Sequence, residues 1–272
     1  MYLLGVLCVA NLATVLAFPN GMSGAVNYLM GMDNSHSLFF LPLMGLGMIY
    51  TTYKRRGLAL KLCLLALFSA SMYITWSASA VVGASVFIIL ALAYELKLRF
   101  KFCNIGLYYA LILVMFLALV IFRAQNIFAF FIENVLKKDL TLTYRTDLWD
   151  ASLGLIAERP LLGHGMISFA AMTKLIGNIN CHSLILQVLF DTGIIGLAVY
   201  LVVMGLLIKP LMRRKDHYVC YYLAAALFSL LLVLTVESLV YPLPFYTICI
   251  LAYHADELIT ALDAPPVDEG TL

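Results

Sequence analysis

The sequence predicts an all-α, polytopic membrane protein, a bundle of about eight transmembrane helices. Hydrophobic residues make up 64% of the 272 residues and charged residues only 12%, whereas a soluble domain has about 25% charged residues. The apolar residues are gathered in runs close to the ~20 residues that cross a bilayer. Charged residues cluster between these runs, as expected for helices that satisfy their own backbone hydrogen bonds in lipid.

Turn and charge signals divide the apolar sequence into spans. The first span ends at Phe18-Pro19-Asn20-Gly21, a turn signature, and the second ends at Lys54-Arg55-Arg56-Gly57. The small polar stretch Trp76-Ser77-Ala78-Ser79 separates the third span from the fourth. The spans are expected at 2–18, 38–53, 58–75, 79–94, 105–122, within 182–208, at 219–236 and at 245–258.

A long polar segment, 123–180, lies between the fifth and sixth spans. It is too long for a simple turn, so we expect it to carry the function. Thr141 or Thr143 is expected to cap a helix that ends near Glu158, because Pro160 disfavours helix at the residue before it. We treat 1–258 as a single membrane domain that includes this loop. The acidic tail, 259–272, is expected to be disordered and cytoplasmic.

The distribution of basic residues predicts the orientation. Eleven of the seventeen Lys and Arg lie in three short connections on one side, and the other six lie in the long loop. Because the positive-inside rule weights short loops, the first side is expected to be cytoplasmic, with both termini. The loop 123–180 then faces outward from a bacterial plasma membrane. Without ATP or nucleotide sugars there, an enzyme must use a substrate already activated in the lipid, such as a lipid diphosphate.

Arg145 and Trp149 lie one turn apart on the helix expected in the loop. Leu148, Trp149, Leu155 and Ile156 form one apolar stripe at helical spacing. One interpretation is an interfacial helix with a Trp anchor and a snorkelling Arg. In the other, Arg145 binds a lipid phosphate, because its guanidinium group matches phosphate oxygens and stays charged.

His182 follows Asn180, a plausible helix N-cap at the start of the sixth span. In a first helical turn the dipole disfavours the imidazolium, so His182 would stay neutral and could act as a general base. A structural histidine at the interface is equally compatible with the sequence. Polar residues near other outward span ends, Glu237, Asn34 and His36, either line a cleft or are ordinary interfacial residues. Asp191 lies within the sixth span, where an acid is a functional candidate, although Gly193 and Gly196 equally suggest a kink.

The six cysteines show no metal-binding spacing, so neither a disulfide framework nor a zinc site is expected. No metal and no cofactor is predicted. The formal net charge of +2 says nothing about partners, because in a membrane protein the distribution of charge matters more than its sum. A basic surface for a nucleic-acid partner has no support in the sequence.

Several motifs together resemble the O-antigen ligase and polysaccharide polymerase superfamily. They are Tyr144-Arg-Thr-Asp-Leu-Trp149, Pro160-Leu-Leu-Gly-His-Gly165, His182-Ser-Leu-Ile-Leu-Gln187 and Asp191-Thr-Gly-Ile-Ile-Gly196. The resemblance implies a metal-independent membrane glycosyltransferase that uses a polyprenyl-diphosphate-linked oligosaccharide. It assigns diphosphate binding to Arg145 and the role of base to His182. Members often have Ser-Arg where this chain has Ser77-Ala78-Ser79, and they are longer, so we expect an N-terminally truncated member.

The resemblance leaves several functions open. Polymerisation of a capsular polysaccharide, exopolysaccharide or O-antigen is favoured, with a flippase and a chain-length regulator as partners. Transfer of a glycan to lipid A core is the first alternative, and a non-enzymatic transporter or flippase component is the second. Beyond His182 and Arg145, we expect substrate contacts from Arg123, Trp149, Arg159, His164, Asp191 and Glu237.

Overall fold

The computed structural model describes residues 2–22, 26–98, 105–137, 139, 144–238 and 242–264. Within these ranges the chain folds into eleven α-helices, which confirms the predicted all-α class. A two-stranded antiparallel hairpin, β1 (Asn27–Tyr28) and β2 (Gly31–Met32), joins the first two helices.

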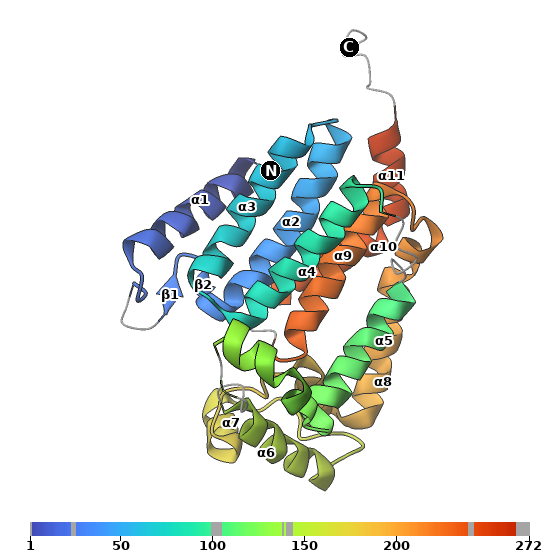
Figure 1. The fold of residues 1–272 in the computed structure, drawn as a ribbon. Coiled ribbons are helices and arrows are strands. Elements are labelled where there is room, and N and C mark those ends of the chain that lie inside the picture. The colour runs from blue at the N-terminus through green and yellow to red at the C-terminus, as the bar shows by residue number, and fades with distance from the viewer. Residues whose placement is uncertain are drawn as a thin grey trace.

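Five apolar helices form one bundle. They are α1 (Tyr2–Ala17), α2 (His36–Tyr53), α3 (Leu58–Ile74), α4 (Ala78–Glu95) and α9 (Tyr218–Leu234). Helix α9 packs against α2 and α4 of this bundle and against three further helices, α5 (Ile105–Phe116), α8 (Leu184–Arg213) and α10 (Pro242–Tyr253). It lies in the middle of the ribbon in Figure 1. Each helix follows an expected apolar run to within about two residues at either end. Pro19 lies just after α1, Lys54 follows α2 and Gly57 precedes α3, so breaker and basic residues mark these limits.

The remaining apolar helices lie beside this bundle. Helix α5 (Ile105–Phe116) continues as a π-helical turn, η2 (Leu117–Ile121), and α8 (Leu184–Arg213) packs on α10 (Pro242–Tyr253). The expected eighth span, 245–258, is broken at His254, where α10 gives way to α11 (Ala255–Asp263). The expected disordered tail, 259–272, therefore includes residues up to Asp263 that are helical in the structure. The apolar side chains of Ala255 and Ile259 on α11 are buried in the main core, which orders residues expected to be disordered.

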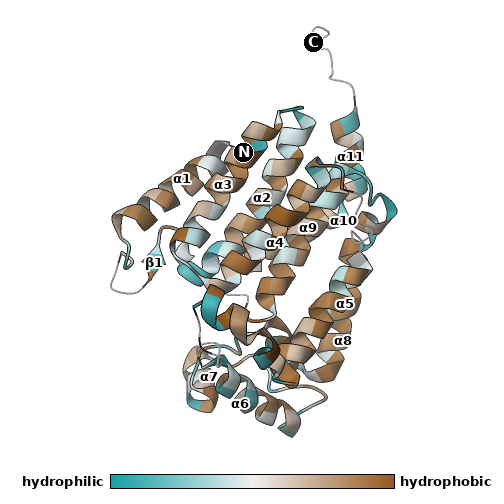
Figure 2. Ribbon diagram, in the orientation of Figure 1, coloured by the Kyte–Doolittle hydropathy of each residue, from teal (hydrophilic) through white to brown (hydrophobic). Residues whose placement is uncertain are grey.

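Two helices in the described part of the chain, α4 and α8, are long and apolar enough to cross a membrane by length and composition alone. Five further apolar helices have 10–17 residues. Figure 2 shows hydrophobic residues along most of the helical surfaces and hydrophilic ones gathered at helix ends and connections. This surface suits an apolar environment over most of the helix length.

The described part of the loop 123–180 forms a helical layer across one end of the bundle. It contains the short helices η3 (Ala124–Phe128) and η4 (Phe131–Val135), then α6 (Arg145–Glu158) and α7 (Phe169–Ile176). Figure 1 places α6 and α7 at the end opposite α11. A second apolar core holds this layer to α5 and α8 through side chains that include Phe116, Trp149, Ile176 and Phe190.

Candidate functional site

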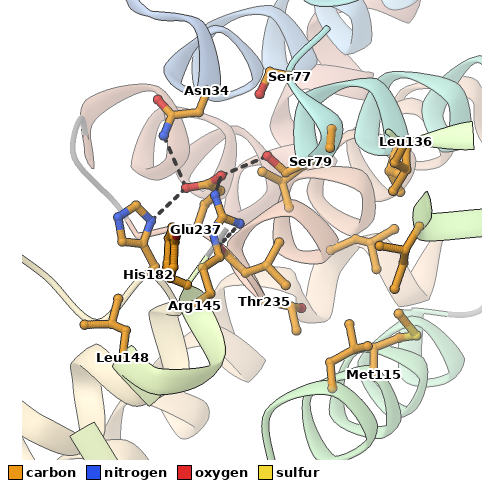
Figure 3. A pocket seen from close by; sticks show the side chains of 18 of the residues that line it. Asn34, Ser77, Ser79, Met115, Leu136, Arg145, Leu148, His182, Thr235 and Glu237 are labelled. Carbon is orange, nitrogen blue, oxygen red and sulfur yellow. Dashed lines mark hydrogen bonds and ion pairs between the residues drawn. The ribbon is translucent and has the colours of Figure 1, made fainter. Parts of the chain in front are cut away.

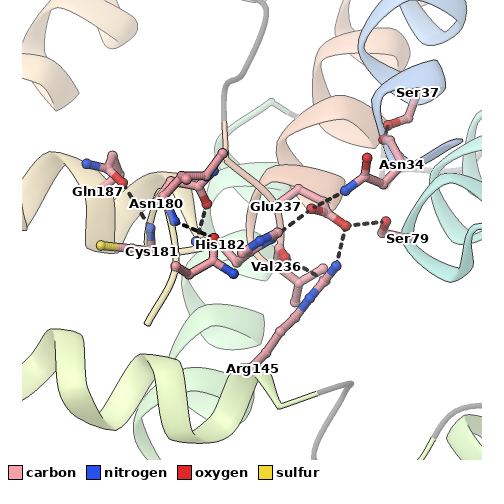
Figure 4. A network of polar contacts seen from close by, with 12 residues as sticks. Asn34, Ser37, Ser79, Arg145, Asn180, Cys181, His182, Gln187, Val236 and Glu237 are labelled. Atoms are coloured by element: carbon pink, nitrogen blue, oxygen red, sulfur yellow. Dashed lines mark hydrogen bonds and ion pairs between the residues drawn. The ribbon is translucent and has the colours of Figure 1, made fainter. Parts of the chain in front are cut away.

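The carboxylate of Glu237 is the centre of a polar cluster between the helical layer and the bundle. Glu237 follows α9, and only 5% of its surface is exposed. Its Oε1 accepts hydrogen bonds from Arg145 Nη2 at 2.5 Å and from Ser79 Oγ at 2.9 Å. Its Oε2 contacts His182 Nδ1 at 3.2 Å and accepts a bond from Asn34 Nδ2 at 3.4 Å. Figure 4 shows these four side chains converging from separate segments of the chain.

The charges in this cluster stabilise one another. Burial alone would raise the pKa of Glu237, but the hydrogen bond from His182 and the positive charge of Arg145 outweigh it. The pKa of Glu237 is therefore below the usual value for a glutamate, and its carboxylate is ionised at neutral pH. Because an ionised carboxylate only accepts hydrogen bonds, the proton between the two side chains belongs to His182 Nδ1. The Nε2 atom of a neutral His182 then keeps its lone pair.

Arg145 is the first residue of α6, and its side chain is directed toward Glu237. Besides the ion pair, Arg145 Nη1 donates a 2.6 Å hydrogen bond to the backbone carbonyl of Val236. The expected caps Thr141 and Thr143 lie outside the described residues, and Tyr144 occupies the N-cap position with a left-handed backbone (φ 63°). The end of α6 at Glu158 agrees with the prediction.

His182 precedes its helix, contrary to the expectation that it lies in the first turn. The N-cap of α8 is Ser183, and His182 has a left-handed backbone (φ 43°). Asn180 does not cap the helix, because its Oδ1 accepts a hydrogen bond from the backbone N–H of His182 at 2.9 Å. This Asx-type turn delays the helix and directs the imidazole to Glu237.

Trp149 and Arg123 lie outside the described cavity lining and contact residues in or next to the site. Trp149 is fully buried, and its Nε1 donates to the carbonyl of His182 at 3.3 Å, so the interfacial-anchor interpretation of Trp149 is wrong. The Arg123 guanidinium lies 5.3 Å from the centre of the Trp149 ring. Arg123 also donates to the carbonyl of Thr146 at 2.9 Å and forms an ion pair with Asp150.

A cavity of about 800 Å³ opens beside this cluster. Its polar lining includes Asn34, Ser79, Arg145, Asp147, His182 and Glu237, and its apolar lining includes Val82, Met115, Leu119, Phe131, Leu136 and Leu148. In Figure 3, His182 and Arg145 lie on one side of the cavity, and Met115 and Leu136 lie on the other. The cavity therefore suits a molecule with one polar and one apolar part.

The predicted turn after α6 packs into a break in α8, away from the cavity lining. Gly193 has a non-helical backbone (φ 65°, ψ −167°) that interrupts α8. The N–H groups of His164 and Gly165 donate to the carbonyls of Phe190 and Asp191 at 2.7 and 2.9 Å, and Ile194 N–H donates to the Pro160 carbonyl at 2.8 Å. The turn thus satisfies backbone groups that the break leaves without helical partners, as an apolar environment requires.

The other expected site residues belong to this turn and break rather than to the described cavity lining. His164 is stacked on Phe190 with ring centroids 4.9 Å apart, and its Nε2 lies 2.7 Å from the Leu155 carbonyl. Asp191 accepts hydrogen bonds from Gln187 at 3.1 Å. Arg159 follows the last residue of α6 and has an exposed side chain.

Comparison with known proteins adds a family to this geometry. A protein-family model described as O-antigen ligase (Wzy_C) matches residues 62–201, about half of the chain. The chain belongs to the O-antigen ligase family. Searches of curated proteins and of solved structures found no match. Membership of the O-antigen ligase family supports the membrane location and the glycan-transferring class that the sequence predicted.

The O-antigen ligase match covers only part of the cluster around Glu237. It includes Ser79, Arg145 and His182, whereas Asn34 and Glu237 lie outside it. The sequence does not predict Ser79 as a site residue, and it indicates Asn34 only as one of the polar residues at a span end. The available signal for both was a short polar residue at the start of an apolar run, which is also common where no site exists.

Proposed function

We propose that this protein is a glycosyltransferase that polymerises polyprenyl-diphosphate-linked repeat units of a surface polysaccharide at the outer face of a bacterial plasma membrane. The observation that carries the proposal is the pairing of Arg145 and His182 on Glu237, at the polar side of a cavity with an apolar far wall. A cation for the diphosphate and a base for the acceptor are thereby within one site.

The donor is proposed to lie along the polar-to-apolar axis of the cavity. Its prenyl chain would contact the wall formed by Met115, Leu119 and Leu136. Its diphosphate would bind Arg145, whose guanidinium group has five N–H donors. Because Arg145 begins α6, the N-terminal turn of that helix adds backbone N–H groups and a favourable dipole for an anion.

His182 is the proposed general base. Its Nε2 would take the proton of an acceptor hydroxyl while that oxygen forms a bond to the anomeric carbon of the donor sugar. The bond from this carbon to the diphosphate oxygen breaks in the same step, and polyprenyl diphosphate leaves with the electron pair. Glu237 orients the imidazole through Nδ1 and stabilises the imidazolium that forms.

The acceptor distinguishes the two reactions that fit this site. A polymerase uses the sugar of a second lipid-linked unit, and a ligase uses lipid A core, which the description of the matched family favours. We propose about eight spans with both termini cytoplasmic, and a flippase and a chain-length regulator as partners of a polymerase. A transport role is less well supported, because the described polar cluster lies where α6 and α8 begin and α9 ends, at one end of the bundle.

The test is an assay of purified protein in nanodiscs with a polyprenyl-diphosphate-linked repeat unit. Lengthening of the glycan on the lipid is expected, and transfer to added lipid A core would instead identify a ligase. We expect His182→Ala to lower the rate by about 10²–10⁴-fold, the usual contribution of a general base. Arg145→Gln should also lower the rate, because the leaving diphosphate loses its cation.

The matched control is His254→Ala, which removes an exposed imidazole that contacts Glu257 and the ring of Tyr253, away from the described cavity lining. Its rate should equal that of the unaltered protein. Unchanged rates in both His182→Ala and Arg145→Gln, at equal amounts of folded protein, would refute the proposed roles.

A further inference from the structure

The Glu237 carboxylate serves two side chains that the proposed reaction uses in different ways. Oε1 is paired with Arg145 and Oε2 contacts His182, so one negative charge is divided between a substrate-binding cation and a base. Asn34 and Ser79 hold one oxygen each from the opposite side. These two contacts keep the carboxylate in place when either partner moves.

A diphosphate bound to Arg145 would share the guanidinium group with two present contacts. Arg145 Nη2 donates to Glu237, and Arg145 Nη1 donates to the Val236 carbonyl. A diphosphate at the remaining N–H groups brings a second anion to the same cation, so it competes electrostatically with Glu237 for Arg145. Weakening the Arg145–Glu237 pair leaves more of the negative charge to act on His182.

We propose that Glu237 couples donor binding to base strength: a diphosphate that draws Arg145 away from Glu237 raises the affinity of His182 for a proton. The coupling rests on the proposed function, because it takes the diphosphate site at Arg145 and the base at His182 as given. His182 is then a stronger base when a donor is bound than when the site is empty. Without a donor, His182 accepts the proton of an acceptor hydroxyl less readily. Glu237 is in this sense a positioning residue that acts through His182.

The electrostatic basis is that the positive charge of Arg145 offsets part of the negative charge of Glu237, which would otherwise stabilise a protonated His182. An opposite charge within about 4–6 Å changes a pKa by roughly 1–3 units, so redistribution of one buried charge is expected to change the His182 pKa by about one unit. This equals a tenfold change in proton affinity. The charged and titratable groups that line the same cavity are Asp33, Tyr144, Arg145, Asp147 and Glu237.

The first test needs no ligand. The pKa of His182 is measured by NMR of histidine-labelled protein in nanodiscs, with His182→Gln used to assign the signal. Four proteins are compared: unaltered, Arg145→Gln, Glu237→Gln and the double variant. Loss of Arg145 is expected to raise the His182 pKa by about one unit more when Glu237 is present than in the Glu237→Gln background. Equal effects in the two backgrounds would overturn the coupling.

The second test adds inorganic pyrophosphate. Saturating pyrophosphate should raise the His182 pKa in the unaltered protein and by clearly less in Glu237→Gln. The charge control is Glu133→Gln, which removes an exposed carboxylate on η4 outside the described cavity lining and leaves the Glu237 contacts intact. This variant should respond to pyrophosphate as the unaltered protein does. A rise in the His182 pKa that is equally large in Glu237→Gln and in the unaltered protein would show that His182 senses the pyrophosphate charge directly, which overturns the proposal.

The two tests separate the coupling from the proposed function. Suppose that the four proteins of the first test show the non-additive effect on the His182 pKa, but pyrophosphate has no effect in the second test. Glu237 would then link Arg145 to His182, whereas the proposed donor site at Arg145 would be refuted. Should Glu237→Gln fail to fold, a double variant that combines Asn34→Ala with Ser79→Ala replaces it. With its two anchoring contacts removed, the carboxylate can follow Arg145, so the pyrophosphate-induced rise should shrink. An undiminished rise in that variant would contradict the proposal.

Discussion

Glu237 illustrates how a charged residue can be buried at this position. Both carboxylate oxygens have two partners, and Arg145 supplies a full balancing charge. A buried ion pair is a weak source of stability in itself, but removal of one partner leaves the other charge without compensation. The cluster therefore fixes the geometry of the site more than it stabilises the fold.

The pH dependence of the free energy of unfolding should reveal the contribution of the Glu237 carboxylate. The folded pKa of Glu237 is below its unfolded value of about 4.3. Its contribution is therefore complete above pH of about 4.3 and is lost as the pH falls through the folded pKa. We expect Glu237→Gln to cost roughly 3 kcal/mol at pH 7. The difference in apparent unfolding temperature from the unaltered protein, at a fixed heating rate, should narrow below about pH 4. A constant difference from pH 7 to pH 3 would contradict this.

The sequence could predict the chemistry of single residues but not their partners. Arg145 and His182 were identified from their positions at helix starts and from the family motifs. The convergence of Asn34, Ser79 and Glu237 on them depends on packing between helices far apart in the chain, which spacing along the sequence does not encode. Trp149 shows the same limit, because an apolar stripe with a Trp predicts an interfacial anchor and a buried core residue equally well.

At the scale of elements, the break in α8 depends on close approach of two backbones. A Cβ atom on Gly193 would lie 2.3 Å from the Leu161 carbonyl carbon, and one on Gly163 would lie 2.6 Å from the Phe190 carbonyl oxygen. Both glycines also have positive φ, which other L-residues rarely adopt. The turn and the break therefore fold as one unit that holds α6 against the start of α8.

Gly193→Ala should destabilise the protein by more than about 1–3 kcal/mol, the usual cost of backbone strain, because it adds a steric clash. The matched control is Gly205→Ala in the same helix, where an added Cβ meets nothing within 4 Å. A glycine inside a helix is less favourable than alanine by about 0.5–1 kcal/mol, so this variant should be neutral or stabilised. Apparent unfolding temperatures in detergent would separate the two, and equal values would refute the role of the break.

Element limits were predicted better than the irregular segments between them. The end of α2 and the start of α3 lie at Lys54-Arg55-Arg56-Gly57, where basic and turn residues interrupt the apolar sequence. The N-cap of α8 is Ser183, three residues after the expected Asn180, because the Asn180 side chain has two possible uses, capping the helix or forming a turn before it. Helix α11 was missed, since short amphipathic segments carry weak signals and depend on burial of residues such as Ile259.

At the scale of the whole molecule, the site and the basic connections lie at opposite ends of the bundle. Asn34, before α2, lines the cavity, whereas Lys54, Arg55 and Arg56 follow the other end of that helix. By the positive-inside rule this polarity predicts an outward-facing cavity. The expected orientation can be tested with single cysteines introduced into a cysteine-free variant. Lys174→Cys lies on the exposed face of α7, and Arg55→Cys lies on the exposed basic connection.

A membrane-impermeant maleimide applied to intact cells should label Lys174→Cys and leave Arg55→Cys unlabelled until the membrane is permeabilised. A second pair of positions, Thr173→Cys and Arg213→Cys, should repeat the pattern from α7 and the end of α8, since both positions are exposed. The reverse pattern would place the cavity in the cytoplasm, where nucleotide sugars are available, and would remove the reason for a lipid diphosphate donor. Labelling thus tests the substrate class as well as the topology, because the side of the membrane decides which activated sugars can reach Arg145 and His182.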